Sequence, residues 1–229
     1  NDIEFVPDWG KNRIHSMIEG RPDWCISRQR TWGVPIPFFV HKDTNALHPR
    51  TPELIEEVAK LIEQEGIDGW YNRDASDFID ADAEQYNAVR DTLDVWFDSG
   101  AMPYAQWHYP FENKEKIDQN TDYPADFIAE GVDQTRGWFY TLHAIGALVF
   151  DRIAYKNVVS NGLVLDKNGQ KMSKRLGNAV DPFETLSEYG PDATRWYMIS
   201  NANPWDNLKF DIEGIAEVRR KFFGTLYNT

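Results

Sequence analysis

The chain contains a single cysteine, Cys25, which excludes an intrachain disulfide and a zinc site built from cysteines. No apolar run is long enough to cross a bilayer. The first residues have neither the basic nor the apolar segment of a signal peptide. These absences favour a reducing, cytoplasmic setting and no membrane partner. The five histidines show no ligand spacing with cysteine or carboxylate partners, so no metal site is predicted.

Basic residues are also scarce in the middle of the chain. The formal net charge of −13 argues against a protein that simply coats nucleic acid. Residues 41–130 carry 21 acidic and 7 basic side chains, whereas residues 1–40 are balanced and residues 131–229 are nearly so. We therefore predict a solvated acidic module, inserted at residues 41–122 between two pieces that can approach polyanions.

Hydrophobic residues make up 41% of the chain, enough for a packed core, and their spacing predicts several elements. A helix is expected from Thr51, which we expect to act as its N-cap, with Pro52 in the first turn and Gly66 at the end. Asp181 and Pro182 mark the start of another helix in the same way. Further helices are expected from about residues 191 and 212.

A strand, a long apolar helix and a second strand are predicted at residues 126–129, 138–150 and 157–160. This order over about 40 residues is typical of a parallel βαβ crossover. Ligands of parallel sheets bind beyond the carboxyl ends of the strands. Residues 130–131 and 161–162 both follow a predicted strand, so we expect a site there and an α/β fold.

Three cations lie close together in the segment Gln-Lys-Met-Ser-Lys-Arg-Leu-Gly-Asn, residues 170–178. Lys171, Lys174 and Arg175 can converge on a polyphosphate, because Gly169 and Gly177 allow the segment to bend. The same charges would match a departing pyrophosphate. A solvated basic loop without a ligand is the alternative.

Polar residues at the predicted strand-to-helix junction form a second candidate site. Glu130, Asp133 and Gln134 can accept hydrogen bonds from sugar hydroxyls and an amine, and Gly131 allows close approach to the backbone. The alternative is an ordinary helix N-terminus, where acidic residues are favourable.

Two tryptophans, Trp32 and Trp138, are stiff, flat and apolar enough to wall a small aliphatic pocket. Ordinary core packing is the alternative for each of them. The pair Asp94 and Asp98 has no spacing that demands catalysis, and Cys25 is interpreted as structural.

Four ordered blocks together resemble the isoleucyl-tRNA synthetase family, a class I aminoacyl-tRNA synthetase family, over essentially the whole chain. Two blocks are the runs from Trp24 to Pro37 and from Leu93 to Gly100. The third runs from Glu130 to Phe139, and the fourth contains the Lys-Met-Ser-Lys-Arg loop, which is similar to the family's KMSKS signature.

The resemblance implies half of a Rossmann-like catalytic core and ATP-dependent attachment of isoleucine to its tRNA. Lys171 and Lys174 would then stabilise the departing pyrophosphate. The residues implied to hold ATP or the adenylate are Glu130, Gly131, Asp133, Gln134 and Lys174. Trp32 and Trp138 would line the amino-acid pocket, and Mg²⁺ would arrive with ATP rather than in a protein cage.

The expected organisation follows the same resemblance. Residues 1–40 are a catalytic core segment, 41–122 the acidic module, and 123–180 the second half of the core with its signature loop. Residues 181–229 form a helical junction towards an anticodon-binding domain.

Two departures from the family pattern affect what we expect of this chain. Arg175 stands where the signature loop often has serine, and no His-x-Gly-His signature is present. We expect a fragment that is inactive alone and needs the remainder of its parent chain. A valyl- or leucyl-tRNA synthetase fragment, or a non-catalytic nucleotide- or tRNA-binding module, are the alternatives.

Overall fold

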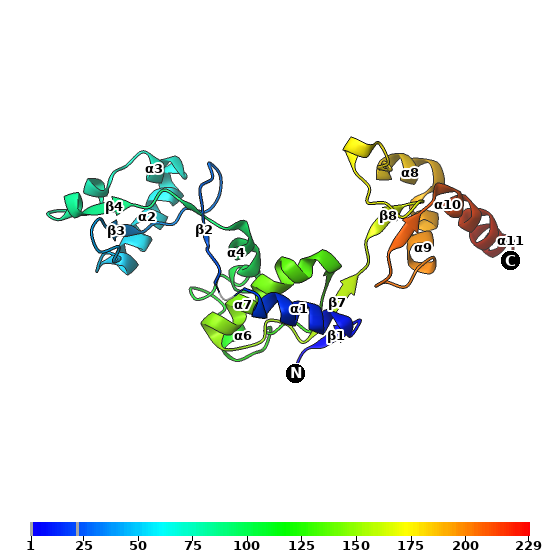
Figure 1. Cartoon of the computed structure of the whole chain (residues 1–229), viewed down its shortest axis with the longest axis horizontal. Helices are drawn as coiled ribbons and strands as arrows, with labels where there is room; N and C mark the ends of the chain where they lie inside the picture. Colours follow the sequence, from blue (N-terminus) through cyan, green and yellow to red (C-terminus); the bar gives the residue numbers. More distant parts are fainter. Residues whose placement is uncertain (1, 22) are drawn as a thin grey trace. The chain divides into compact units, whose positions relative to one another are not determined.

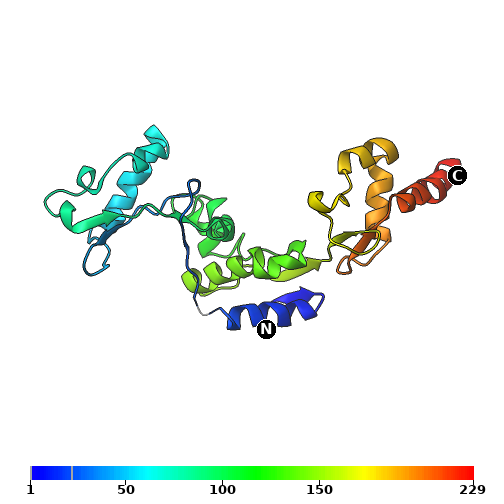
Figure 2. The ribbon, with the colours of Figure 1, turned by 45° about the horizontal axis from the view of Figure 1, so that its top comes forward.

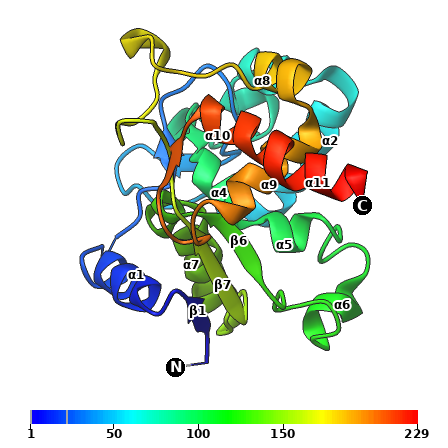
Figure 3. The ribbon, with the colours of Figure 1, turned by 90° about the vertical axis from the view of Figure 1, so that its right-hand side faces the viewer.

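A three-stranded parallel sheet is the centre of the first of two units in the computed structural model, which describes residues 2–21 and 23–229. This unit comprises Asn1–Arg21 with Pro103–Thr229, and the second comprises Pro22–Met102. The strands are β1 (Glu4–Val6), β7 (Asn157–Asn161) and β6 (Ile128–Gly131), in that order across the sheet. Both pairings are parallel, and Figure 3 shows the strands side by side.

Helix α7 (Trp138–Phe150) connects β6 to β7 and has the bounds that the sequence predicted. Its buried residues are Phe139, Tyr140, Thr141, Leu142, Ile145 and Gly146. Burial of each large apolar side chain contributes about 1.5–3 kcal/mol, which explains why this apolar run forms a covered helix. The predicted βαβ crossover and α/β fold are confirmed.

Helix α1 (Trp9–Glu19) follows β1. It is tied to the short 3₁₀ helix η3 (Val132–Arg136) because Arg13 Nε donates to Thr135 Oγ1 at 2.8 Å. Thr135 in turn donates to the carbonyl of Val132. The segment after β6 is thus held from two sides.

Residues 103–122 belong to this first unit, although the charge pattern assigned them to the acidic module. Tyr104, in α5 (Met102–Ala105), stacks on Phe150 with ring centroids 4.3 Å apart. Its hydroxyl lies 2.8 Å from that of Tyr123, and both rings are buried. This aromatic packing places residues 103–122 with the first unit, despite their acidic composition. The same stretch contains α6 (Lys114–Asp118).

The second unit is built from two small antiparallel strand pairs and one long helix. β2 (Ser27–Arg28) pairs with β5 (Thr92–Leu93), and β3 (Phe39–His41) pairs with β4 (Tyr86–Ala88). The remaining elements are α2 (Thr51–Glu65), α3 (Asp68–Tyr71), η1 (Ala75–Asp77), η2 (Ala83–Gln85) and α4 (Val95–Gly100). Figure 1 shows α2 beside the β3–β4 pair.

Helix α2 confirms the predicted bounds but not the predicted cap. Thr51 is the first helical residue, and its hydroxyl donates to the carbonyl of His48 instead of capping the helix. Leu54 and Val58 face a core completed by Phe39, Trp70 and Ile79. Gly66, at φ +76°, ends the helix, as the sequence predicted.

The C-terminal segment of the first unit surrounds a parallel pair, β8 (Val164–Asp166) and β9 (Leu208–Phe210). Its helices are η4 (Lys174–Leu176), α8 (Pro182–Tyr189), α9 (Pro191–Ser200), α10 (Ile212–Val218), the π-helical turn η5 (Arg219–Phe223) and α11 (Gly224–Asn228). Figure 2 shows these helices, coloured from yellow to red, next to the strand pair. Asp181 caps α8 by accepting from the N–H groups of Phe183 and Glu184, as predicted.

Candidate active site

The first group of predicted site residues lies at the carboxyl end of β6. Glu130 and Gly131 are the last residues of the strand, and Gly131 is opposite Asn161 of β7. Asp133 and Gln134 follow in η3. The parallel pairing therefore brings these residues to the edge where ligands of such sheets bind.

Gly131 leaves room for the side chain of Asp133. A Cβ atom added at Gly131 would lie 2.7 Å from Asp133 Oδ1, so the exposed Asp133 side chain would have to move. Within residues 2–21 and 23–229, neither the Glu130 nor the Asp133 carboxylate has an ion pair, and both residues are exposed. Both can accept hydrogen bonds from a ligand.

Gln134 has a structural task that the sequence did not predict. Its Oε1 accepts the N–H of Trp138 at 3.0 Å, at the first residue of α7. The four N-terminal amides of a helix have no intrahelical partner, so this bond satisfies one of them. The same hydrogen bond fixes the Gln134 side chain against the start of α7 and leaves its amide nitrogen as a donor.

The basic loop forms the second group and follows β8. Lys171 forms an isolated antiparallel β-bridge with Leu165. Ser173 Oγ accepts the N–H of Leu176 and so caps η4. Gly177, at φ +66°, ends η4 in the left-handed region that favours glycine. Met172 packs against the C-terminal core of Tyr197, Phe210 and their neighbours.

The cations of this loop are exposed at the surface. Among the residues that the structure describes, Lys171, Lys174 and Arg175 make no ion pair, and all three are exposed. Their positive charge is therefore available to an anion. An anchored backbone with free cations is the arrangement expected of a phosphate-binding loop.

The two predicted pocket tryptophans lie in different units. Trp138 starts α7 and is half-buried, whereas Trp32 is 86% exposed in the second unit. Trp32 lines a cavity of about 1170 Å³ together with apolar residues of α2 and with Trp96. Shared lining of one pocket by Trp32 and Trp138 stays a prediction.

An ion pair in the second unit escaped sequence reasoning. Asp94 is only 4% exposed and accepts from Arg28 Nη2 at 2.5 Å, from Trp24 Nε1 at 3.0 Å and from the N–H of Trp96 at 3.1 Å. Burial and the charge of Asp94 raise the pKa of the nearby Asp98. In the sequence, Arg28 and Asp94 stand in two of the blocks that resemble the synthetase family, but nothing there indicates that they pair.

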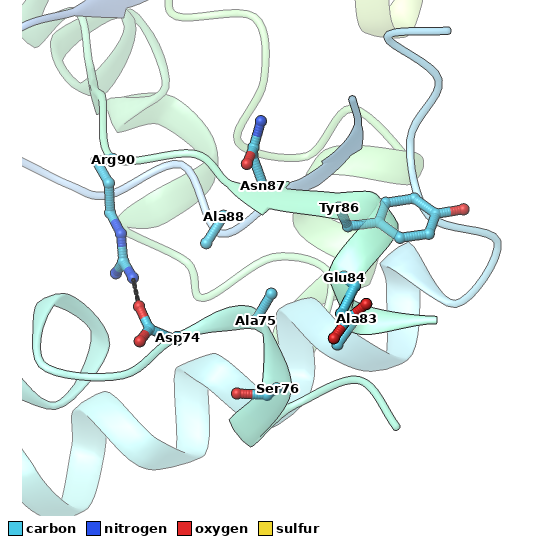
Figure 4. Close-up of a pocket in the computed structure, with 9 residues that line it drawn as sticks. All are labelled: Asp74, Ala75, Ser76, Ala83, Glu84, Tyr86, Asn87, Ala88 and Arg90. Carbon is cyan, nitrogen blue, oxygen red and sulfur yellow. Dashed lines mark ion pairs between the residues drawn. The ribbon is translucent and has the colours of Figure 1, made fainter. Parts of the chain in front are cut away.

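Figure 4 shows a smaller hollow in the same unit, in which the side chains of Arg90 and Asp74 point towards each other. Arg90 Nη1 donates to the carbonyl of Trp70 at 2.6 Å, and its guanidinium lies 5.2 Å from the Trp70 ring centre. Arg90 also donates to the carbonyl of Arg73. These bonds tie Arg90 to the backbone of residues 70–73. None of the predicted site residues lines the hollow.

Within the described ranges, residues 2–21 and 23–229, no three or more His, Cys, Asp or Glu side chains cluster in a way that could hold a metal ion. In the same ranges, no helix combines the length and the apolar character that a membrane span requires.

A family model described as "tRNA synthetases class I (I, L, M and V)" matches residues 1–211. The chain belongs to this class I tRNA synthetase family. Similar curated proteins include an isoleucine–tRNA ligase of Bacteroides fragilis, 53% identical over 256 aligned residues, which cover 99% of this chain and 22% of the relative. An isoleucine–tRNA ligase of Acinetobacter baylyi is 62% identical over 201 residues, 88% of this chain and 20% of the relative. The chain thus spans about a fifth of these synthetases.

Solved synthetases share the fold of this chain. A methionyl-tRNA synthetase of Mycobacterium tuberculosis in complex with methionyl-adenylate matches 97% of this chain and 34% of its own, with a TM-score of 0.63 and 19% identity. A LeuRS of Agrobacterium radiobacter, solved in a ternary complex with tRNA and LeuAMS, matches 91% of this chain and 30% of its own, with a TM-score of 0.61 and 21% identity. At these identities the likeness concerns the fold alone.

Proposed function

We propose that this chain is a catalytic-core part of an isoleucine–tRNA ligase, which activates isoleucine with ATP and transfers it to tRNA(Ile). The observation that carries the proposal is the anchored loop, whose three cations are exposed and make no ion pair within residues 2–21 and 23–229. The identity of 53–62% to isoleucine–tRNA ligases supports isoleucine as the amino acid.

In this proposal the isoleucine carboxylate attacks the α-phosphate of ATP in line, and pyrophosphate leaves. Lys171 and Lys174 stabilise the negative charge that develops on the pyrophosphate, a contribution that grows in the transition state. Mg²⁺ arrives as part of the ATP substrate. The protein's contribution is mainly positioning and charge stabilisation.

The end of β6 holds the rest of the nucleotide. Glu130 and Asp133 accept from ribose hydroxyls and from the amino group of isoleucine, and Gly131 lets the adenylate approach the backbone. Gln134 contributes as a donor through its amide nitrogen, because its Oε1 already accepts from Trp138. Trp32 and Trp138 enclose the aliphatic side chain.

Pyrophosphate exchange by the full-length parent, with isoleucine, valine and leucine compared separately, tests the proposal. We expect exchange that depends on isoleucine. Exchange that depends on valine or leucine would assign a different branched-chain synthetase. ATP binding without exchange for any amino acid would favour a non-catalytic nucleotide- or tRNA-binding module.

The proposed activity belongs to the whole synthetase in the cytoplasm, where tRNA(Ile) is its partner. The 229-residue chain alone is expected to form no isoleucyl-adenylate above background. The His-x-Gly-His signature that the family uses for the ATP phosphates has to come from the remainder of the parent chain.

A further inference from the structure

Asp166 and Asn178 close the two ends of the basic loop onto each other. Asp166 is 9% exposed, and its Oδ2 accepts Asn178 Nδ2 at 2.9 Å. Its Oδ1 accepts the backbone N–H groups of Asn168 and Gln170 at 2.9 and 2.8 Å. One carboxylate therefore fixes the turn before the loop and the residue that ends it.

Asn178 transmits this anchoring to the middle of the loop. Its Oδ1 accepts the backbone N–H of Ser173 at 2.9 Å. Its Nδ2, besides donating to Asp166, lies 3.3 Å from the carbonyl oxygen of Lys171. The backbone of the loop is thus held at Lys171 and at Ser173, immediately beside Lys174.

We propose that Asp166 and Asn178 are positioning residues that hold Lys171 and Lys174 in the orientation required for activation. This inference rests on the proposed function of the loop. Neither side chain is assigned a contact with substrate. Both act on the backbone that carries the two lysines.

The chemistry of the pair makes it specific for an aspartate and an asparagine in this order. Asp166 only accepts hydrogen bonds, whereas Asn178 must donate to Asp166 and accept from Ser173. The hydrogen bonds from the Gln170 N–H and from Asn178 lower the pKa of Asp166, so the carboxylate stays charged at neutral pH. Such charge-assisted hydrogen bonds are the stronger kind.

Each single exchange breaks the pair in a defined way. In Asn178→Asp, a carboxylate oxygen faces a carboxylate oxygen of Asp166. In Asp166→Asn, two amide groups face each other, and either orientation of Asn178 leaves donor against donor, at Asp166 or at Ser173. In the double variant D166N/N178D, each of these hydrogen bonds again has one donor and one acceptor, except the contact to the Lys171 carbonyl. The double variant also keeps the net charge.

Hydrogen-exchange mass spectrometry of the full-length parent, read on peptides covering residues 167–178, tests the anchoring itself. We expect about tenfold or faster exchange in both single variants, the size of losing one charge-assisted hydrogen bond. The double variant should return to within about threefold of the native protein. Native-like exchange in Asn178→Asp would overturn the anchoring.

Pyrophosphate exchange by the same variants tests the positioning role. We expect kcat to fall at least about tenfold in the single variants, with the KM for isoleucine within about twofold, and to recover in the double variant. A loosened loop with unchanged kcat would overturn positioning. Absence of exchange in the native parent itself would instead contradict the proposed function while leaving the anchoring measurable.

Asn203→Asp provides a matched control. Asn203 Nδ2 donates to Asp206 Oδ2 at 2.9 Å, which is the same pairing of side chains at an exposed turn outside the loop. This variant should leave both the loop exchange and kcat unchanged. Equal effects of Asn203→Asp and Asn178→Asp would show that the losses reflect general destabilisation, and would overturn the inference.

Discussion

Arg28 and Asp94 are 66 residues apart in the sequence and form an ion pair, with 2.5 Å between Nη2 and Oδ2. The pair joins β2 to the residue that caps α4, because Asp94 Oδ1 also accepts the N–H of Trp96. The Arg28 side chain remains 37% exposed, whereas that of Asp94 is almost fully covered. The charge of Asp94 therefore depends on Arg28 for compensation.

Replacing Asp94 by asparagine should destabilise the second unit by about 2 kcal/mol. A buried partner of a charged pair is costly to remove, and the partial exposure of Arg28 reduces that cost. Urea unfolding followed by tryptophan fluorescence measures the change. Asp91→Asn is the control, since the Asp91 carboxylate accepts from the exposed side chain of Gln29, and its replacement should change stability by less than about 0.5 kcal/mol. Equal losses in both variants would contradict a special role of Asp94.

Lys174→Ala in the full-length parent should lower pyrophosphate exchange by about 100-fold, the effect of losing one oriented electrostatic contact. The Lys174 side chain is exposed and makes no ion pair among the described residues, so unfolding should shift by no more than about 0.5 kcal/mol. Initial rates at saturating ATP and isoleucine provide the measurement.

Lys167→Ala is the matched control for Lys174. Lys167 is an exposed cation of the same segment but lies outside the predicted set of site residues. Its replacement should keep exchange within about twofold. Comparable losses for both lysines would indicate a general effect of positive charge rather than a role of Lys174 in the loop.

The elements that the sequence predicted well are those whose causes are local. The bounds of α7 follow from an apolar run that has to be buried, and the start of α8 follows from Asp181 and Pro182. The parallel pairing of β6 and β7 follows from the handed crossover that a helix of this length allows. Local spacing was sufficient in each case.

The features that the sequence did not predict depend on residues that meet only after folding. The hydrogen bond between Asp166 and Asn178 and the pair Arg28–Asp94 carry no local signal. The module boundary was drawn from charge, but Tyr104 packs on Phe150 and draws residues 103–122 into the first unit. The composition of residues 103–122 shows that they are acidic, but it does not show that Tyr104 packs on Phe150.

Trp32→Ala should raise the KM for isoleucine by about tenfold or more in the full-length parent, while the KM for ATP stays within about twofold. The loss of about 1.5–3 kcal/mol of apolar contact with the substrate accounts for the size of the effect. Because Trp32 is 86% exposed, its removal should leave unfolding nearly unchanged. Phe111→Ala, another highly exposed aromatic residue, is the control. Equal rises in both KM values would argue against a role in the amino-acid pocket.

Burial of His143 should make the free energy of unfolding of the first unit depend on pH. The residue lies on α7, its Nδ1 is buried without a hydrogen-bond partner among the described residues, and burial lowers its pKa. In the unfolded chain histidine takes up a proton near pH 6.5. The folded state binds that proton more weakly, so the stability from neutral His143 is present above about pH 6.5 and is lost as the pH falls through the lower folded pKa.

Urea unfolding of the native chain and of His143→Gln between pH 8 and pH 5 measures this contribution. The native chain should lose more stability than the variant as the pH falls below about 6.5, because glutamine does not titrate. His15→Gln is the control, because His15 is exposed on α1: an equal flattening of the profile in this variant would show that burial of a histidine is not the cause. If His143→Gln and the native chain follow parallel profiles over this range, burial of His143 does not couple folding to pH.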